Sequence, residues 1–154
     1  MATSPTLGDD PRTLNALGMQ ALARDDPAEA EGLFARAAAA DPGAAPLWMN
    51  LATARRARGD DAGERAALEG ALATDQRHVM ANVRMAELHD RLGEGRAAAF
   101  RWGGVATVLE ATPGRTPALD GLLAQARARR RADGAVRRGG RRRARPGARC
   151  ARRE

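Results

Sequence analysis

The chain has 154 residues, enough for one domain with a buried core. Only 3% of the residues are aromatic and none is tyrosine, so small side chains must supply most of the packing. All 26 basic residues are arginine, and the net charge of +7 is unevenly divided. Residues 1–126 hold 13 arginines against 17 acidic residues (−4), whereas residues 127–154 hold 13 arginines against 2 acidic residues (+11). The basic character therefore belongs to the C-terminal segment.

Composition and patterning also argue against several classes of protein. Cys150 is the only cysteine, so no internal disulfide can form. The first ten residues have no basic segment followed by an apolar run, and nowhere do about 18 apolar residues follow one another. We therefore expect no signal peptide and no membrane span, and we predict a cytoplasmic bacterial protein.

The first predicted unit spans residues 11–44, after a disordered lead at residues 1–10. Pro11 fits the first turn of a helix, and leucines at helical spacing follow it. A second helix start is Asp25-Asp26-Pro27, because aspartate caps a helix and proline fits its first position. Asp41-Pro42-Gly43 ends that second helix. The unit is thus predicted to be a helix-turn-helix.

Two further units repeat this plan, at residues 45–78 and 79–112. Their predicted internal turns contain Gly59 and Gly93. Residues 113–128 follow, with an amphipathic pattern that predicts one more helix to cover the open end of the array.

Glu64 is the weak point of the second unit. It puts a charge where the repeating pattern has a small residue against the neighbouring helix. Two explanations remain open from the sequence: the carboxylate reaches solvent, or Arg55 and Arg65 lie near enough to compensate it.

Internal repetition is the strongest signal in the sequence. Equivalent apolar or small residues recur every 34 positions: Leu17, Leu51 and Met85; Gly18, Ala52 and Ala86; Ala37, Ala71 and Val105. A unit of this length cannot bury its own apolar face and must stack on its neighbours.

These residues resemble the tetratricopeptide repeats, whose pattern has a bulky residue, Leu-Gly, a small alanine, an aromatic residue and a closing proline. The first unit keeps five of these positions: Leu17, Gly18, Ala30, Phe34 and Pro42. The second and third units keep fewer but share the period. The resemblance implies an all-α fold: an α-solenoid of three helix-turn-helix repeats plus a capping helix, followed by a disordered basic tail at residues 129–154.

In that family the first helices of the repeats form a concave face that binds extended peptides. The resemblance therefore implies a non-catalytic protein-interaction module with a protein or peptide partner, no small-molecule substrate and no cofactor. The positions expected to face the groove are Arg12, Asn15, Met19, Met49, Asn50, Thr53, Arg56, Met80, Val83, Arg84, Glu87 and Asp90. Methionines mixed with polar side chains suit a peptide with apolar anchors and a few hydrogen bonds.

Some members of the family hold the terminal carboxylate of a peptide with five basic and amide residues. Asn50 and Arg84 occupy two of those five positions here. Asn15, Met19 and Met80 stand where two lysines and an asparagine would be needed. The departures favour an unspecialised groove over a carboxylate clamp.

Enzymatic sites have little support. His78 and His89 lie on different parts of the third unit, with no cysteine or acidic cluster at metal-ligand spacing, so we interpret both as surface or packing residues and predict no metal site. Gly103 and Gly104 lie inside a helical pattern and predict close packing or a kink.

The arginine-rich tail has two interpretations. A disordered basic arm at residues 129–154 would bind nucleic acid or an anionic surface through its charge. Alternatively, the abrupt change in composition is what GC-rich DNA encodes when it is translated out of frame. We keep nucleic-acid binding as the third functional hypothesis.

A second resemblance supplies another alternative. Residues 78–100 are similar to the helical arrays that precede an aspartyl/asparaginyl β-hydroxylase domain in some bacterial proteins. Such a domain would use Fe(II), 2-oxoglutarate and paired histidines, and no histidine follows His89 here. On this alternative the chain is the truncated accessory region of a hydroxylase.

Overall fold

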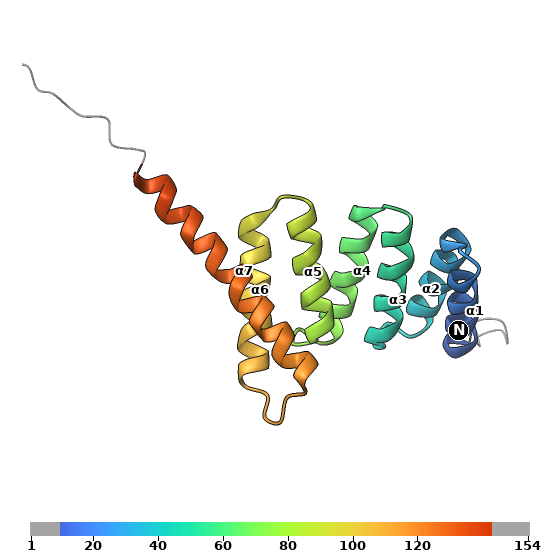
Figure 1. The fold of residues 1–154 in the computed structure, drawn as a ribbon. Coiled ribbons are helices and arrows are strands. Elements are labelled where there is room, and N and C mark those ends of the chain that lie inside the picture. The colour runs from blue at the N-terminus through green and yellow to red at the C-terminus, as the bar shows by residue number, and fades with distance from the viewer. Residues whose placement is uncertain (1–9, 143–154) are drawn as a thin grey trace, which may run out of the picture.

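The computed structural model describes the backbone of residues 10–142 and the side chains of residues 10–132. Within that part all the regular secondary structure is α-helical, and there is no strand. The helices are α1 (Pro11–Ala23), α2 (Pro27–Ala40), α3 (Ala45–Ala57), α4 (Asp61–Thr74), α5 (Val79–Arg91), α6 (Gly95–Glu110) and α7 (Pro117–Arg142). Antiparallel pairs stand in a row from α1/α2 to α5/α6, and α7 closes the row (Figure 1). The predicted all-α solenoid is confirmed.

Aspartate side chains cap the starts of α1, α2 and α4. The carboxylates of Asp10, Asp26 and Asp60 accept hydrogen bonds from backbone N–H groups three residues later, at 2.8–2.9 Å. Pro11 and Pro27 follow two of these caps at the first helical position. The aspartate and proline pattern thus defines the helix boundaries locally.

The turn inside each helix pair contains one residue in the left-handed region. These residues are Asp25 (φ 61°), Gly59 (φ 72°) and Gly93 (φ 72°), and they are spaced by 34 positions. Glycine adopts this conformation without steric cost, whereas aspartate is one of the few other residues that tolerate it. The repeat is therefore present in the backbone as well as in the sequence.

Aromatic rings lying directly over glycines bring the helices close together. A Cβ atom on Gly18 would lie 2.6 Å from Cε1 of Phe34, and one on Gly70 would lie 2.5 Å from Cε3 of Trp48. The Trp48 indole N–H also donates to the carbonyl of Pro42 at 2.9 Å. Half of the buried apolar residues that the structure describes, 13 of 26, are alanines, in keeping with the low aromatic content.

Replacing Gly70 with alanine is expected to lower the free energy of unfolding by about 1–3 kcal/mol, because the new methyl group overlaps the ring of Trp48. Gly32→Ala is the matched control, since Gly32 also lies inside a helix but a methyl group there would have no atom within 4 Å. That change is expected to raise stability by about 0.5–1 kcal/mol. Denaturant unfolding followed by circular dichroism measures both. Equal effects at the two glycines would contradict the ring placement.

Helix α7 corrects two sequence predictions. It does not end near Ala128 but runs to Arg142, so the expectation of disorder from residue 129 is wrong as far as Arg142. Alanine and arginine favour helices, and no proline interrupts the chain between Pro117 and Pro146. The end of α7 extends away from the array (Figure 1). The predicted lead at residues 1–9 and the tail at residues 143–154 lie outside the described residues.

Two ion pairs attach α7 to the array. Arg127 pairs with Glu110 at 2.8 Å, and Arg129 pairs with Asp90 at 3.2 Å. On the apolar side of α7, Leu123 and Ala126 are buried in a cluster with α5 and α6. The helix therefore covers the open end of the third pair, as a capping element should.

Glu64 is buried, so the first explanation offered for it is wrong. Its side chain is 0% exposed, and its partner is Arg91 on α5, which also pairs with Asp61 at 2.7 Å. Arg55 and Arg65 instead pair with Glu31 (3.0 Å) and Glu94 (2.9 Å). The second explanation therefore named the wrong arginines, although an arginine does compensate the charge.

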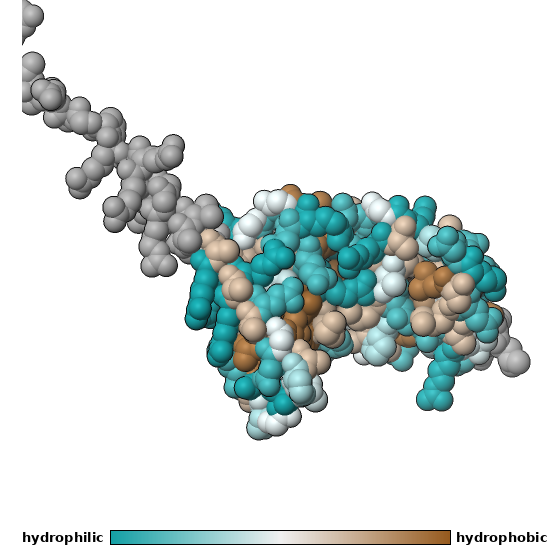
Figure 2. All heavy atoms as spheres, in the orientation of Figure 1, coloured by the Kyte–Doolittle hydropathy of each residue, from teal (hydrophilic) through white to brown (hydrophobic). Residues whose placement is uncertain are grey.

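The surface is mostly hydrophilic on the face seen in Figure 2, where apolar residues form small patches between helices. None of the helices in the described part of the chain is long and apolar enough to cross a membrane.

Candidate functional site

The first helices of the three pairs, α1, α3 and α5, are joined by hydrogen bonds between residues that the sequence predicts to face a groove. Asn50 Nδ2 donates to Asn15 Oδ1 at 2.7 Å, which joins α3 to α1. Arg84 Nη1 donates to Thr53 Oγ1 at 2.8 Å and to the Met49 carbonyl at 3.1 Å, which joins α5 to α3. All five residues are half-buried. We call these five residues the polar row.

The polar row holds its side chains in defined positions while leaving donors free. A guanidinium has five N–H donors, and both hydrogen bonds of Arg84 come from one nitrogen, Nη1. Among the residues with described side chains, no carboxylate lies within ion-pair distance of Arg84. Burial lowers the pKa of this guanidinium, and nearby Glu64 and Glu87 partly oppose that shift. Arg84 thus presents a partly desolvated positive charge.

At the α7 end of the same face lies a hollow of about 260 Å³, which we call the end hollow. Arg56 and Glu87 form an ion pair at 3.7 Å in its lining. Asp90 accepts from the Trp102 indole at 2.9 Å as well as pairing with Arg129. The end hollow is lined by Arg56, Glu87, Asp90, Arg91, Gln125 and Arg129. Three of these six residues were predicted from the sequence.

Sequence reasoning missed Arg91, Gln125 and Arg129. The last two lie one turn apart on α7, and Arg129 was missed because the helix was expected to end before it. The signal that could have found it is the run of alanine and arginine at residues 126–132, which continues past Ala128 and favours a helix.

The remaining predicted groove residues do not join these two groups. Val83 is 4% exposed and belongs to the apolar cluster of α5, α6 and α7, so the structure places it in the core and not on the groove. Capping by α7 is the physical reason, because this helix buries apolar residues of α5. Arg12, Met19 and Met80 are exposed, and the two methionines are each 50% exposed.

Both histidines have structural partners. His78 Nδ1 accepts from the Ala81 N–H at 3.1 Å and caps α5. His89 is 7% exposed and lies beside Glu94. Hydrogen bonds from His89 and Arg65 lower the pKa of the Glu94 carboxyl. In the part of the chain with described side chains, no three histidine, cysteine or acidic residues come together as metal ligands.

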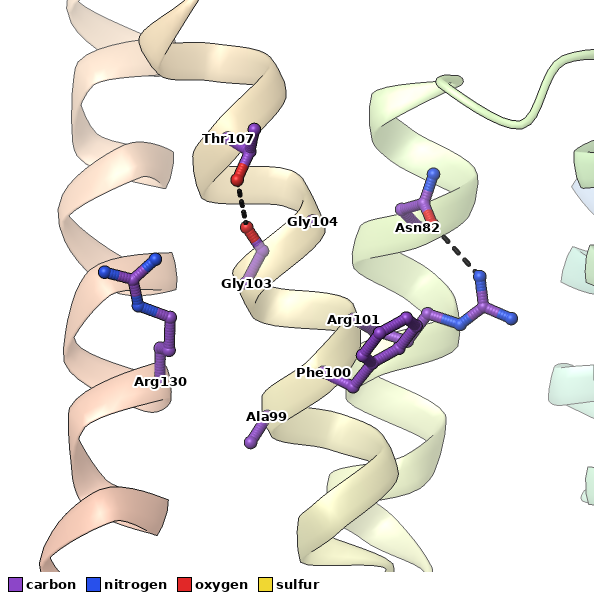
Figure 3. A pocket seen from close by; sticks show the side chains of 8 residues that line it. All are labelled: Asn82, Ala99, Phe100, Arg101, Gly103, Gly104, Thr107 and Arg130. Carbon is purple, nitrogen blue, oxygen red and sulfur yellow. Dashed lines mark hydrogen bonds between the residues drawn. The ribbon is translucent and has the colours of Figure 1, made fainter.

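A second open region lies on α6, outside the groove, and Figure 3 shows it from close by. Close packing or a kink was predicted at Gly103 and Gly104, but a Cβ on Gly104 would meet no described atom within 4 Å. One on Gly103 would meet only Arg130 Cδ, at 3.5 Å. The prediction of close packing is therefore wrong for Gly104. The glycines instead line a hollow of about 470 Å³ over α6, whose lining also includes Phe100, Asn82 of α5 and Arg130 of α7.

No protein-family model matches the sequence, and no curated protein does. Solved structures match along most of the chain. PcrH in complex with the chaperone binding region of PopD is 21% identical, with a TM-score of 0.68 over 82% of this chain and 92% of that one. The Yersinia enterocolitica type III secretion chaperone SycD, in complex with a peptide of the translocator YopD, is 14% identical, with a TM-score of 0.69 over 82% and 93%.

A third match is the first TPR of Spaghetti (RPAP3) bound to an HSP90 peptide, which is 16% identical, with a TM-score of 0.63 over 79% of this chain and 93% of that one. The comparisons support neither a hydroxylase accessory region nor a nucleic-acid binder. At these identities the similarity concerns the fold. The chain therefore has the fold of a tetratricopeptide-repeat array, with three helix pairs and a long closing helix.

Proposed function

We propose that this protein is a non-catalytic interaction module that binds an extended peptide segment of a partner protein along the face formed by α1, α3 and α5. The observation that carries the proposal is the polar row, in which hydrogen bonds join α1 to α3 and α3 to α5 through residues predicted to face the groove. Side chains that are already ordered lose less entropy on binding, which favours affinity. Three solved structures with this fold contain bound peptides or partner segments, which also supports the proposal.

The chemistry of the face indicates the kind of peptide. Met19 on α1 and Met80 on α5 lie outside the polar row but offer flexible apolar contacts on the two outer helices, and their exposure leaves them accessible. Arg84 offers donors to a backbone carbonyl or a carboxylate of the ligand. We therefore expect ligands with at least one apolar side chain and one acidic or carbonyl group spaced to reach Arg84.

The test starts from peptides selected on the immobilised protein from a random library. The double variant Asn50→Ala/Arg84→Ala is expected to bind these peptides at least about tenfold more weakly, because a charge-assisted hydrogen bond is lost. Fluorescence anisotropy measures the dissociation constants. Thermal unfolding of each variant separates lost affinity from lost folding.

Arg96→Ala is the matched control. Arg96 is an exposed arginine on α6, away from the polar row, so this change removes the same charge without touching the groove. Its affinity for the selected peptides is expected to equal that of the unaltered protein. Unchanged binding by a folded Asn50→Ala/Arg84→Ala variant would overturn the assignment of the groove.

A further inference from the structure

Phe100 stands out on α6 because its side chain is 78% exposed, more than any other large apolar side chain that the structure describes. The repeat does not require an aromatic residue there. At steps of 34 positions the equivalent residues are Gly32 and Ala66, both small and both exposed. Packing within the array therefore does not account for Phe100.

The hollow beside Phe100 exists because an aromatic ring of the preceding repeat has no counterpart. In the second pair, Trp48 covers Gly70. One repeat later the equivalents of these two residues are Asn82 and Gly104. The Asn82 amide donates to the carbonyls of Gln76 (2.9 Å) and His78 (3.1 Å), so the shorter side chain is held by the loop before α5 and leaves Gly104 uncovered.

Helix α6 thus carries an exposed aromatic ring at Phe100 and also a glycine, Gly104, over which no aromatic ring packs. Gly104 lies one helical turn after Phe100. Side chains on a helix lean toward its N-terminus, so the Phe100 ring lines one edge of the hollow and leaves the space over Gly104 free for a ring from outside. Figure 3 shows Phe100 and Arg130 on opposite sides of the two glycines, with the stretch between them open.

We propose that this surface is a contact between two copies of the chain, in which Phe100 of each copy packs over Gly103 and Gly104 of the other. A two-fold contact is self-complementary, since residue i meets residue j and residue j meets residue i. A projecting ring next to a hollow meets that condition. The residues that line this hollow are separate from the polar row and the end hollow, so the pairing leaves the proposed peptide site open.

Charged side chains on the two sides of Phe100 also favour a second copy of the chain as the occupant of the hollow. A second hollow of about 430 Å³ adjoins Phe100 on its α4 side and contains Glu69, whereas the first hollow contains Arg130 on its α7 side. Neither side chain has a hydrogen-bond or ion-pair partner among the described residues. A two-fold axis that exchanges Phe100 with the hollow brings the α4 side of one copy toward the α7 side of the other. Glu69 of each copy then lies opposite Arg130 of the other copy, so the contact contains two such charge pairs.

Sedimentation equilibrium of the full chain tests the proposal. The unaltered protein is expected to approach twice its chain mass of 16.3 kDa as its concentration rises toward about 1 mM. Phe100→Ala is expected to weaken dimerisation about tenfold or more, because buried aromatic anchors dominate such contacts. Gly104→Leu fills the hollow from within, at a place where the fold has room, and is expected to do the same.

Two further sets of variants distinguish a contact at this surface from a contact elsewhere on the molecule. Leu17→Ala removes another exposed apolar side chain, 43% exposed at the far end of the array, and is expected to leave dimerisation unchanged. Glu69→Arg and Arg130→Glu are each expected to weaken the dimer, and the two together to restore it. A chain that stays monomeric throughout, or a dimer that Phe100→Ala leaves intact, would overturn the proposal. Each variant is first checked for unaltered thermal unfolding.

Discussion

Replacing Phe34 with alanine is expected to lower the free energy of unfolding by about 3–5 kcal/mol, as for other buried aromatic residues. The ring is 0% exposed and belongs to the apolar cluster that links α1 and α2 to the second pair. Its removal leaves a cavity, because the close-packed side chains around it can relax only partly into the space. Urea unfolding followed by circular dichroism gives the difference.

Gly18 provides the control for this prediction. A methyl group at Gly18 would overlap the Phe34 ring, so Gly18→Ala alone is expected to cost about 1–3 kcal/mol. In the Phe34→Ala background the ring is gone, and the same change is expected to cost almost nothing. A loss below about 1 kcal/mol for Phe34→Ala, or strictly additive effects of the two changes, would show that the ring does not lie over Gly18.

Local signals account for the part of the fold that could be predicted from the sequence. The order Asp26-Pro27 starts α2 because a cap and a fixed φ act within one turn. The constant step between repeats located the helix pairs because stacking requires every unit to present equivalent residues to its neighbours. Such signals depend on residues near one another in the sequence or on a regular period, so they can be recognised without a structure.

The errors have a different physical origin. Val83 was assigned to the groove from its position in the repeat, but the closing helix buries it, and nothing near Val83 in the sequence indicates that. The end of α7 was placed too early because a change in composition was taken for the end of order, whereas alanine and arginine both favour helix. The residues of the polar row were all among the predicted positions, but the hydrogen bonds between them depend on distances between helices, which the sequence does not contain.

Glu64 shows most clearly that a contact between helices cannot be predicted from a single position. Its partner, Arg91, lies on another helix, and both residues depart from the repeat. The equivalents of Glu64 are Ala30 and Ala98, and those of Arg91 are Ala23 and Ala57. Two neighbouring repeats have therefore exchanged a pair of alanines for an ion pair at their junction, between α4 and α5. Neither departure can be interpreted without the other.

Arg91→Ala is expected to lower the free energy of unfolding by about 2–3 kcal/mol. Removing one partner of a buried ion pair leaves the other charge uncompensated, which costs about 3–5 kcal/mol when both are fully buried. The lower value is expected here because the Arg91 side chain is 37% exposed and water can partly replace it. One carboxylate oxygen of Glu64, Oε1, already has no hydrogen-bond partner among the described residues, so few groups remain to stabilise the carboxylate once Arg91 is removed. Urea unfolding measures the loss.

The double variant Glu64→Ala/Arg91→Ala decides whether the uncompensated charge is the cause. It installs the alanines that the other repeats carry at both positions, and it is expected to recover most of the stability lost in Arg91→Ala. Arg65→Ala is the matched control, since Arg65 pairs with the exposed carboxylate of Glu94 and its loss is expected to cost less than about 1 kcal/mol. If Arg91→Ala costs no more than this control, the Glu64 charge is solvated and the junction is not held by the pair. If the double variant is less stable than Arg91→Ala, the pair contributes through packing, because the aliphatic part of Glu64 then matters more than its charge.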